Sequence, residues 1–136
     1  TANDIAKKYV DKLQTTKKTH IIEISNFVND AEKILKNGDL NDFGKLLHES
    51  WIQKKALSSK ITNYSIDQIY RESLKKGAIG GKLLGAGGGG FLLLYVPHHR
   101  QSAIIKHFNK LTTIPFQFST EGSKIMFKNI EKVNRN

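Results

Sequence analysis

The residues whose types and spacing point most directly to chemistry form a short glycine-rich segment in the second half of the chain. Residues 85–90 read Gly-Ala-Gly-Gly-Gly-Gly, so five of the six positions carry no side chain. The bare backbone N–H groups of such a segment can approach a phosphate group closely and form an anion-binding concavity. A flexible connector is the alternative interpretation. Because apolar runs bound the segment tightly, we favour a close approach of another group to its backbone.

Three common glycine motifs fail when their sequence context is considered. Gly85, Gly87 and Gly90 satisfy G-x-G-x-x-G, but a dinucleotide site needs this pattern to open a helix. Here the pattern opens residues 91–94, Phe-Leu-Leu-Leu, which indicate a strand. A Walker loop needs Gly-Lys-Ser/Thr after the glycines, whereas Lys82 precedes them. A protein-kinase hairpin has the right context, but the sequence lacks that family's His-Arg-Asp loop.

The first half of the chain supplies the helices that must support this segment. Apolar residues at spacings of three and four predict four amphipathic helices, over residues 3–13, 18–37, 39–52 and 65–76. We expect Asn37-Gly38 to end the second helix in a left-handed conformation and Asp39 to cap the third. The fourth is predicted to start at Ser65 and to end at Gly77.

The second half reads as strands around one further helix. Strands are predicted on both sides of the glycine segment and again near the end, over residues 78–84, 91–96, 114–118 and 124–127. The helix follows Pro97 and carries apolar residues as far as Leu111. Helices followed by strands predict an α+β fold, with helices on one face of a small, mostly antiparallel four-stranded sheet. We expect residues 1–136 to form a single domain.

The basic composition invites a nucleic-acid interpretation, which the residue types disfavour. The chain has 22 Lys+Arg against 12 Asp+Glu, a formal charge of +10, but only three of the 22 are Arg. Base readout and bidentate phosphate contacts favour Arg, and the lysines are spread over most of the chain. We therefore expect a lysine-rich solvated surface and no nucleic-acid partner.

Cysteine usage and hydropathy exclude further classes. With no cysteine, a disulfide scaffold, a thiolate metal site and a cysteine nucleophile are all excluded. The longest apolar run, residues 91–96, is far shorter than the ~20 residues of a membrane span, so no membrane partner is expected. No signal segment is recognised, which predicts a cytoplasmic location.

The string over residues 80–91, Gly-Gly-Lys-Leu-Leu-Gly-Ala-Gly-Gly-Gly-Gly-Phe, closely resembles the third motif of the GHMP small-molecule kinases. That motif reads Lys-x-Thr-Gly-Ala-Gly-x-Gly-Gly, so Leu84 stands where a Thr is usual and a hydroxyl is missing. Residues 47–51, Leu-His-Glu-Ser-Trp, look like the sugar-kinase branch. The resemblance implies transfer of a phosphoryl group from ATP, with Mg2+, to a sugar hydroxyl. D-glycero-D-manno-heptose 7-phosphate is the leading acceptor, and fucose or galactose is the alternative.

The resemblance also implies which residues lie near the phosphates, namely Gly85, Ala86, Gly87, Gly88 and Gly89. The family holds ATP with a Pro-x-x-x-Gly-Leu-Gly-Ser-Ser motif in an N-terminal domain, and this sequence contains no such motif. We therefore expect the C-terminal portion of a kinase, which needs an N-terminal kinase domain as its partner and is inactive alone. A stand-alone module that binds phosphate or a protein partner is the alternative.

Other chemistry-bearing side chains have two interpretations each. Lys82 is a possible contact for an anionic substrate, although solvent exposure or a structural ion pair is favoured. Lys54, Lys55 and Lys60 could attract a substrate phosphate, but a solvated helix face is the simpler account. Neither a catalytic residue nor a metal site is predicted. Roles as caps or surface groups explain six candidates better: Asp30, Asp39, Asp42, Asp67, His98 and His99. His48 and Glu49 lack the second His of a zinc-protease pattern, because position 52 is Ile.

Overall fold

The computed structural model describes residues 18–118 and 121–124. In this part of the chain, four helices and two strands follow one another in the order α2 (Lys18–Asn37), α3 (Leu40–Leu57), α4 (Tyr64–Lys75), β1 (Gly80–Leu83), β2 (Leu92–Tyr95) and α5 (His98–His107). The predicted α+β class is confirmed. The helix predicted over residues 3–13 lies outside the described residues. None of the described helices is long and apolar enough to cross a membrane.

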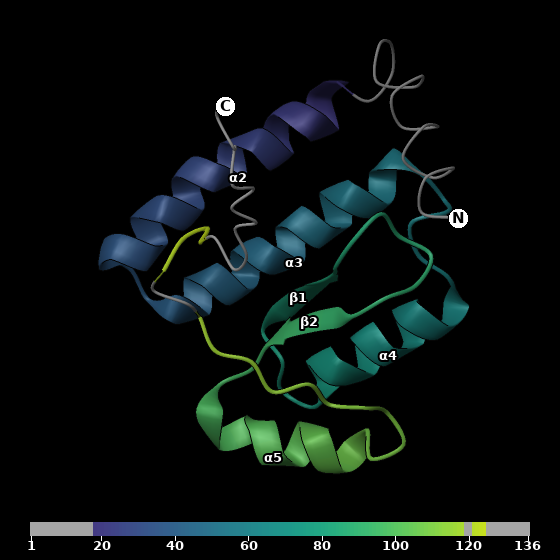
Figure 1. The fold of residues 1–136 in the computed structure, drawn as a ribbon. Coiled ribbons are helices and arrows are strands. Elements are labelled where there is room, and N and C mark those ends of the chain that lie inside the picture. Colours follow the sequence, from purple (N-terminus) through teal and green to yellow (C-terminus); the bar gives the residue numbers. More distant parts are fainter. Residues whose placement is uncertain (1–17, 119–120, 125–136) are drawn as a thin grey trace, which may run out of the picture.

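Helices α2 and α3 are joined by only two residues and pack against each other (Figure 1). Asp39 caps α3 as predicted, because its carboxylate accepts a hydrogen bond from the backbone N–H of Asn41 at 2.9 Å. That bond holds the pKa of Asp39 below its ordinary value. Helix α2 ends at Asn37 as predicted, but Gly38 does not have the left-handed φ that was expected. A Cβ there would lie 2.8 Å from Cα of Ile34, so glycine is needed for close approach.

Helix α4 begins one residue earlier than predicted, at Tyr64, and its cap is Asn63. The side-chain oxygen of Asn63 accepts a hydrogen bond from the backbone N–H of Ile66 at 3.0 Å. Asparagine is among the preferred residues at a helix N-cap, which accounts for the start of the helix at Tyr64.

The end of α4 follows the prediction. Gly77 is left-handed, with φ of 104°, and its N–H donates to the carbonyl of Leu74 at 3.0 Å. The N–H of Ala78 donates to the carbonyl of Ser73, also at 3.0 Å. These two bonds form a Schellman motif, which turns the chain from α4 into β1.

The sheet has two antiparallel strands in the part that the structure describes. Gly80 pairs with Tyr95 and Leu83 pairs with Leu92, which places the glycine segment at the hairpin turn. The strand predicted over residues 114–118 is not formed: this run is irregular. Its apolar side chains are more than half exposed, and no described strand pairs with it, so alternation alone did not produce a strand. Residues 125–127 of the last predicted strand lie outside the described residues.

Helix α5 starts directly after Pro97, as predicted, and His98 and His99 are exposed in its first turn. It ends at His107, so Leu111, which was predicted to lie on the helix, falls after it.

The buried core joins three elements and one connection. Trp51 of α3, Tyr70 of α4, Leu83 of β1 and Ile61 between the helices are each at most 3% exposed. The core position predicted for Trp51 is confirmed. Figure 1 shows the two strands between α3 and α4, with α2 on the far side of α3. The glycine hairpin therefore extends from the best-packed part of the molecule.

Candidate functional site

The glycine loop joins β1 to β2 and has a conformation that few other residues could adopt. Four of its glycines have positive φ angles: Gly85 (88°), Gly87 (114°), Gly88 (77°) and Gly90 (122°). A residue with a Cβ is disfavoured in this region by roughly 1–2 kcal/mol. The loop is closed at its base by the N–H of Leu84, which donates to the carbonyl of Phe91 at 2.9 Å. The backbone path, and not only the lack of side chains, therefore requires glycine.

The middle of the loop rests on the connection between α3 and α4. The N–H of Gly88 donates to the carbonyl of Ile61 at 2.9 Å, and the side-chain amide of Asn63 donates to the carbonyl of Gly88 at 3.4 Å. A Cβ at Gly87 would lie only 2.7 Å from Cα of Ile61. In contrast, a Cβ at Gly85 or Gly89 would meet nothing within 4 Å. The loop is thus supported on one side and open on the other.

Lys54 reaches the same loop from the last turn of α3. Its ammonium donates to the carbonyl of Gly85 at 2.5 Å and to the carbonyl of Leu83 at 3.2 Å. Burial lowers the pKa of Lys54 below its ordinary value, and the positive charge of Lys82 lowers it further. The predicted solvated helix face is therefore wrong for this lysine.

Lys82 lies on β1, directly beside the start of the loop, and is partly buried. Its ammonium donates to the hydroxyl of Ser50 at 3.3 Å, and Ser50 is only 8% exposed. The favoured prediction placed the Lys82 ammonium in solvent or in an ion pair. In the structure its partner is a neutral hydroxyl. Ser50 and Lys54 lie four residues apart and so share one face of α3. That spacing predicts the shared face, but it does not show that the face lies beside the loop.

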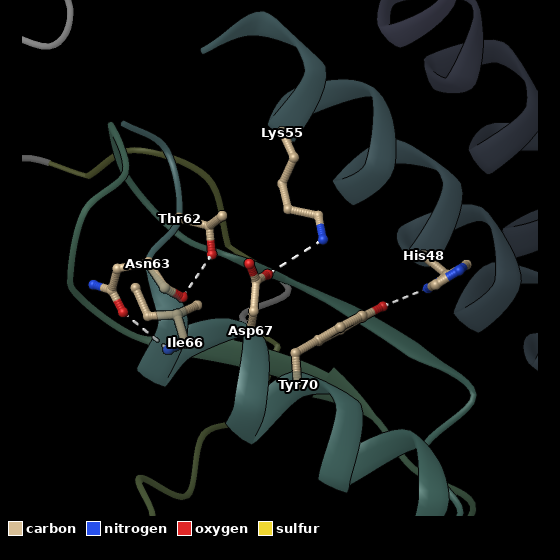
Figure 2. A network of polar contacts seen from close by, with 7 residues as sticks. All are labelled: His48, Lys55, Thr62, Asn63, Ile66, Asp67 and Tyr70. Carbon is tan, nitrogen blue, oxygen red and sulfur yellow. Dashed lines mark hydrogen bonds and ion pairs between the residues drawn. The ribbon is translucent and has the colours of Figure 1, made fainter. Parts of the chain in front are cut away.

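Lys55, the next lysine of the predicted cluster, contacts a different part of the molecule. Figure 2 shows Lys55 directed toward α4, where its ammonium lies 3.3 Å from the carboxylate of Asp67. The same ammonium lies 5.6 Å from the ring centroid of Trp51. Lys60 is exposed. The structure therefore separates Lys54 from Lys55, its neighbour in the sequence.

A second polar contact joins α3 to α4 farther from the loop (Figure 2). Nδ1 of His48 lies 2.7 Å from the phenol oxygen of Tyr70, and the two rings stack with their centroids 5.8 Å apart. Burial raises the pKa of Tyr70 to about 12, although a hydrogen bond from the Gly81 backbone opposes the rise. Since the phenol accepts from Gly81, it can donate its own proton to His48. This contact fixes α3, α4 and β1 to one another, which is a structural role.

The acidic residues have the structural roles that the sequence predicts. Asp39 is the cap of α3, and three others pair with lysines: Asp30 with Lys33, Asp42 with Lys45 and Asp67 with Lys55. Across residues 18–118 and 121–124, no three or more His, Asp or Glu side chains come together as a metal site would require.

A comparison with known protein families gives a match that covers the loop and the elements that support it. The profile of the family described as GHMP kinases C terminal matches residues 31–111, which include α3, both strands and the whole glycine loop.

Curated relatives are sugar kinases. A D-glycero-alpha-D-manno-heptose 7-phosphate kinase of Campylobacter jejuni is 32% identical over 68% of this chain and 28% of its own length. A galactokinase of Clostridium perfringens is 30% identical over 73% of this chain and 27% of its own length. An L-fucokinase/L-fucose-1-P guanylyltransferase of Bacteroides fragilis is 30% identical over 69% of this chain and 10% of its own length. The chain spans less than a third of the length of these relatives.

Among solved structures, the L. major mevalonate kinase in complex with R-mevalonate superposes with a TM-score of 0.71. The superposition covers 81% of this chain and 34% of the mevalonate kinase chain, at 21% sequence identity. It therefore supports the fold alone. A mevalonate kinase from methicillin-resistant Staphylococcus aureus has a TM-score of 0.56 at 28% identity, over 69% of this chain and 32% of its own.

Proposed function

Because the chain belongs to the GHMP kinase family, we propose that it supplies the C-terminal domain of an ATP-dependent sugar kinase. The observation that carries this proposal is the glycine loop, which is fixed by its contacts with Ile61 and Lys54 but open at Gly85 and Gly89. A loop that is rigid and unobstructed suits the close approach of a phosphate group.

In this proposal the chain contributes positioning and positive charge. Phosphoryl transfer depends largely on holding the reactants in line and on neutralising the charge of the phosphoryl oxygens. MgATP supplies the phosphoryl group and is bound chiefly by an N-terminal kinase domain. The backbone of residues 85–89 lies near the phosphates, and the ammonium groups of Lys54 and Lys82 make the base of the loop positive. No residue of this chain is assigned to the transfer of a proton or to Mg2+.

The acceptor that we propose is D-glycero-D-manno-heptose 7-phosphate. Its support is the similarity to the Campylobacter jejuni kinase together with the two lysines beside the loop. An acceptor that already carries a phosphate gains from such a positive site, whereas a neutral sugar does not. Galactose or fucose is the alternative acceptor, which the galactokinase and fucokinase relatives favour.

A sugar panel tests the acceptor. The full-length protein that contains this chain is assayed with MgATP against the heptose 7-phosphate, galactose and fucose, by release of ADP and mass of the product. We expect one added phosphoryl group on the heptose 7-phosphate and a kcat/KM at least about tenfold above the neutral sugars, as expected for one charge-assisted contact. A preference for galactose or fucose would contradict the proposed acceptor but would still support a sugar kinase.

A second assay separates the kinase from the stand-alone module. We expect the 136-residue chain alone to phosphorylate none of these sugars, since it lacks the ATP-binding motif of the family. Addition of a separately produced N-terminal domain should restore turnover. Turnover by the isolated chain would contradict the division of labour. If the full-length protein shows no turnover, saturable shifts of the Gly85–Gly89 amide signals on titration with inorganic phosphate would favour the binding module.

A further inference from the structure

Among the residues that the structure describes, only the side chain of Lys54 donates hydrogen bonds to the backbone on both sides of Leu84, where the loop begins. Its ammonium contacts the carbonyl of Leu83, the last residue of β1, and the carbonyl of Gly85, the first glycine of the loop. Leu84 lies between these two carbonyls and closes the hairpin through its own N–H. A single charged group thus restrains three consecutive residues at the point where the strand becomes the loop.

The surroundings of Lys54 disfavour its charged form, so the hydrogen bonds to the two carbonyls must stabilise the ammonium. Burial and the neighbouring charge of Lys82 both disfavour the ammonium form. Within residues 18–118 and 121–124, no ion pair with a carboxylate compensates for them. Lys55, the next residue, has such a pair with Asp67. The two carbonyl oxygens are therefore the groups that hold the charge of Lys54 in place.

The contacts of Lys54 complement those of Ile61. Ile61 supports the loop at Gly87 and Gly88, and Lys54 supports it at Leu83 and Gly85. The two supports bracket Ala86, the one loop residue between the glycines that carries a side chain. Without Lys54, the β1 end of the loop would be restrained mainly by the bond between Leu84 and Phe91.

We propose that Lys54 is a positioning residue, whose ammonium holds the Leu83–Gly85 carbonyls and thereby fixes the entrance of the glycine loop in the shape that receives a phosphate. The structural half of the proposal stands on these contacts alone, whereas its catalytic consequence rests on the proposed function. The experiment therefore has one arm for each half.

The structural arm uses amide hydrogen exchange in the 136-residue chain. Lys54→Met removes the charge and retains much of the side-chain length, and Lys45→Met is the matched control on the exposed face of the same helix. We expect exchange at Leu84 to accelerate about tenfold in Lys54→Met, as for loss of a hydrogen bond to a charged group, with Gly88 less affected. Unchanged exchange at Leu84 in a folded Lys54→Met would overturn the proposal.

Fluorescence of the single tryptophan, Trp51, reports whether Lys54→Met remains folded. If it does not, the wild-type chain still decides the question by NMR. A bound ammonium should give a slowly exchanging Nζ signal with scalar couplings to the carbonyl carbons of Leu83 and Gly85. Absence of both couplings would contradict the assignment.

The catalytic arm uses the full-length protein. We expect Lys54→Met to lower kcat about tenfold or more with a smaller change in the KM for ATP, because the loop is displaced and not removed. Lys54→Arg should recover most of kcat, since a guanidinium can donate to two carbonyls at once. Equal losses in Met and Arg variants would contradict positioning through the carbonyls. If the full-length protein is not a sugar kinase, the exchange and coupling results still stand by themselves.

Discussion

The glycines between α3 and β1 and the glycines of the loop are required for different reasons. Where α3 packs on the sheet, Gly44 and Gly80 approach so closely that a Cβ on Gly80 would lie 1.9 Å from the Gly44 carbonyl oxygen. Neither has a positive φ. In the loop, Gly85 has a positive φ but space for a Cβ, and Gly89 has space without a positive φ. Glycine content alone therefore does not distinguish packing from an open site.

Gly87 belongs to both groups. It has a φ of 114°, as the loop requires, and a Cβ would lie 2.7 Å from Cα of Ile61, as in a packing contact. The loop is therefore a continuation of the packed core at its middle and an exposed surface at its two sides. Glycine-to-alanine substitutions, which add one methyl group, can test the difference between the packed glycines and the open ones.

The largest effect is expected for Gly80→Ala. The new methyl group would collide with the backbone of α3, which cannot move without separating helix and sheet, so we expect a loss of about 3 kcal/mol in the free energy of unfolding. Urea unfolding followed by Trp51 fluorescence measures it. A loss below that of Gly89→Ala would contradict the packing role.

A smaller loss, of about 2 kcal/mol, is expected for Gly87→Ala. The substitution adds backbone strain at positive φ to a contact with Ile61 that can relax by displacement of the loop. The same urea titration gives the free energy, and exchange at the Gly88 amide should increase. If stability falls while that amide stays protected, the strain and not the Ile61 contact would be the cause.

Tyr70→Phe tests the polar contact beside the packing glycines, and we expect a loss of about 1 kcal/mol at neutral pH, because His48 and the Gly81 amide lose a partner. The raised pKa, about 12 against an ordinary 10, favours the protonated phenol in the folded state. Its contribution is therefore fully present below pH 10 and is lost as the pH rises toward 12. Unfolding titrations at pH 8 and pH 11 should show a smaller difference between wild type and variant at the higher pH. An unchanged difference would contradict a raised pKa.

The smallest effect on stability is expected for Gly89→Ala, within about 0.5 kcal/mol, because a Cβ there meets nothing and φ is not positive. In the full-length protein the same methyl group would lie on the open side of the loop. We expect kcat/KM to fall severalfold with an unchanged urea midpoint. Unchanged kinetics would indicate that Gly89 lies away from the phosphates.

The sequence predicted the features that depend on neighbouring residues. The Asp39 cap, the Gly77 turn and the loop between two strands all follow from local chemistry and periodicity. It did not predict contacts between distant residues, because nothing in the order of residues places Lys54 beside Gly85, 31 positions later. The predicted strand over residues 114–118 failed for a related reason: a strand needs a partner, and alternation does not provide one.

Asn63 gives the molecule a mechanical property of its own. The oxygen of its amide caps α4, and the nitrogen of the same amide contacts the glycine loop at Gly88. Any displacement of the loop that keeps this contact must rotate the amide and pull on the first turn of α4. Displacement of the loop and fraying of the helix end are thereby coupled through a single planar group. Asn63→Asp would retain the cap and remove the donor, which would leave each end free to move without the other.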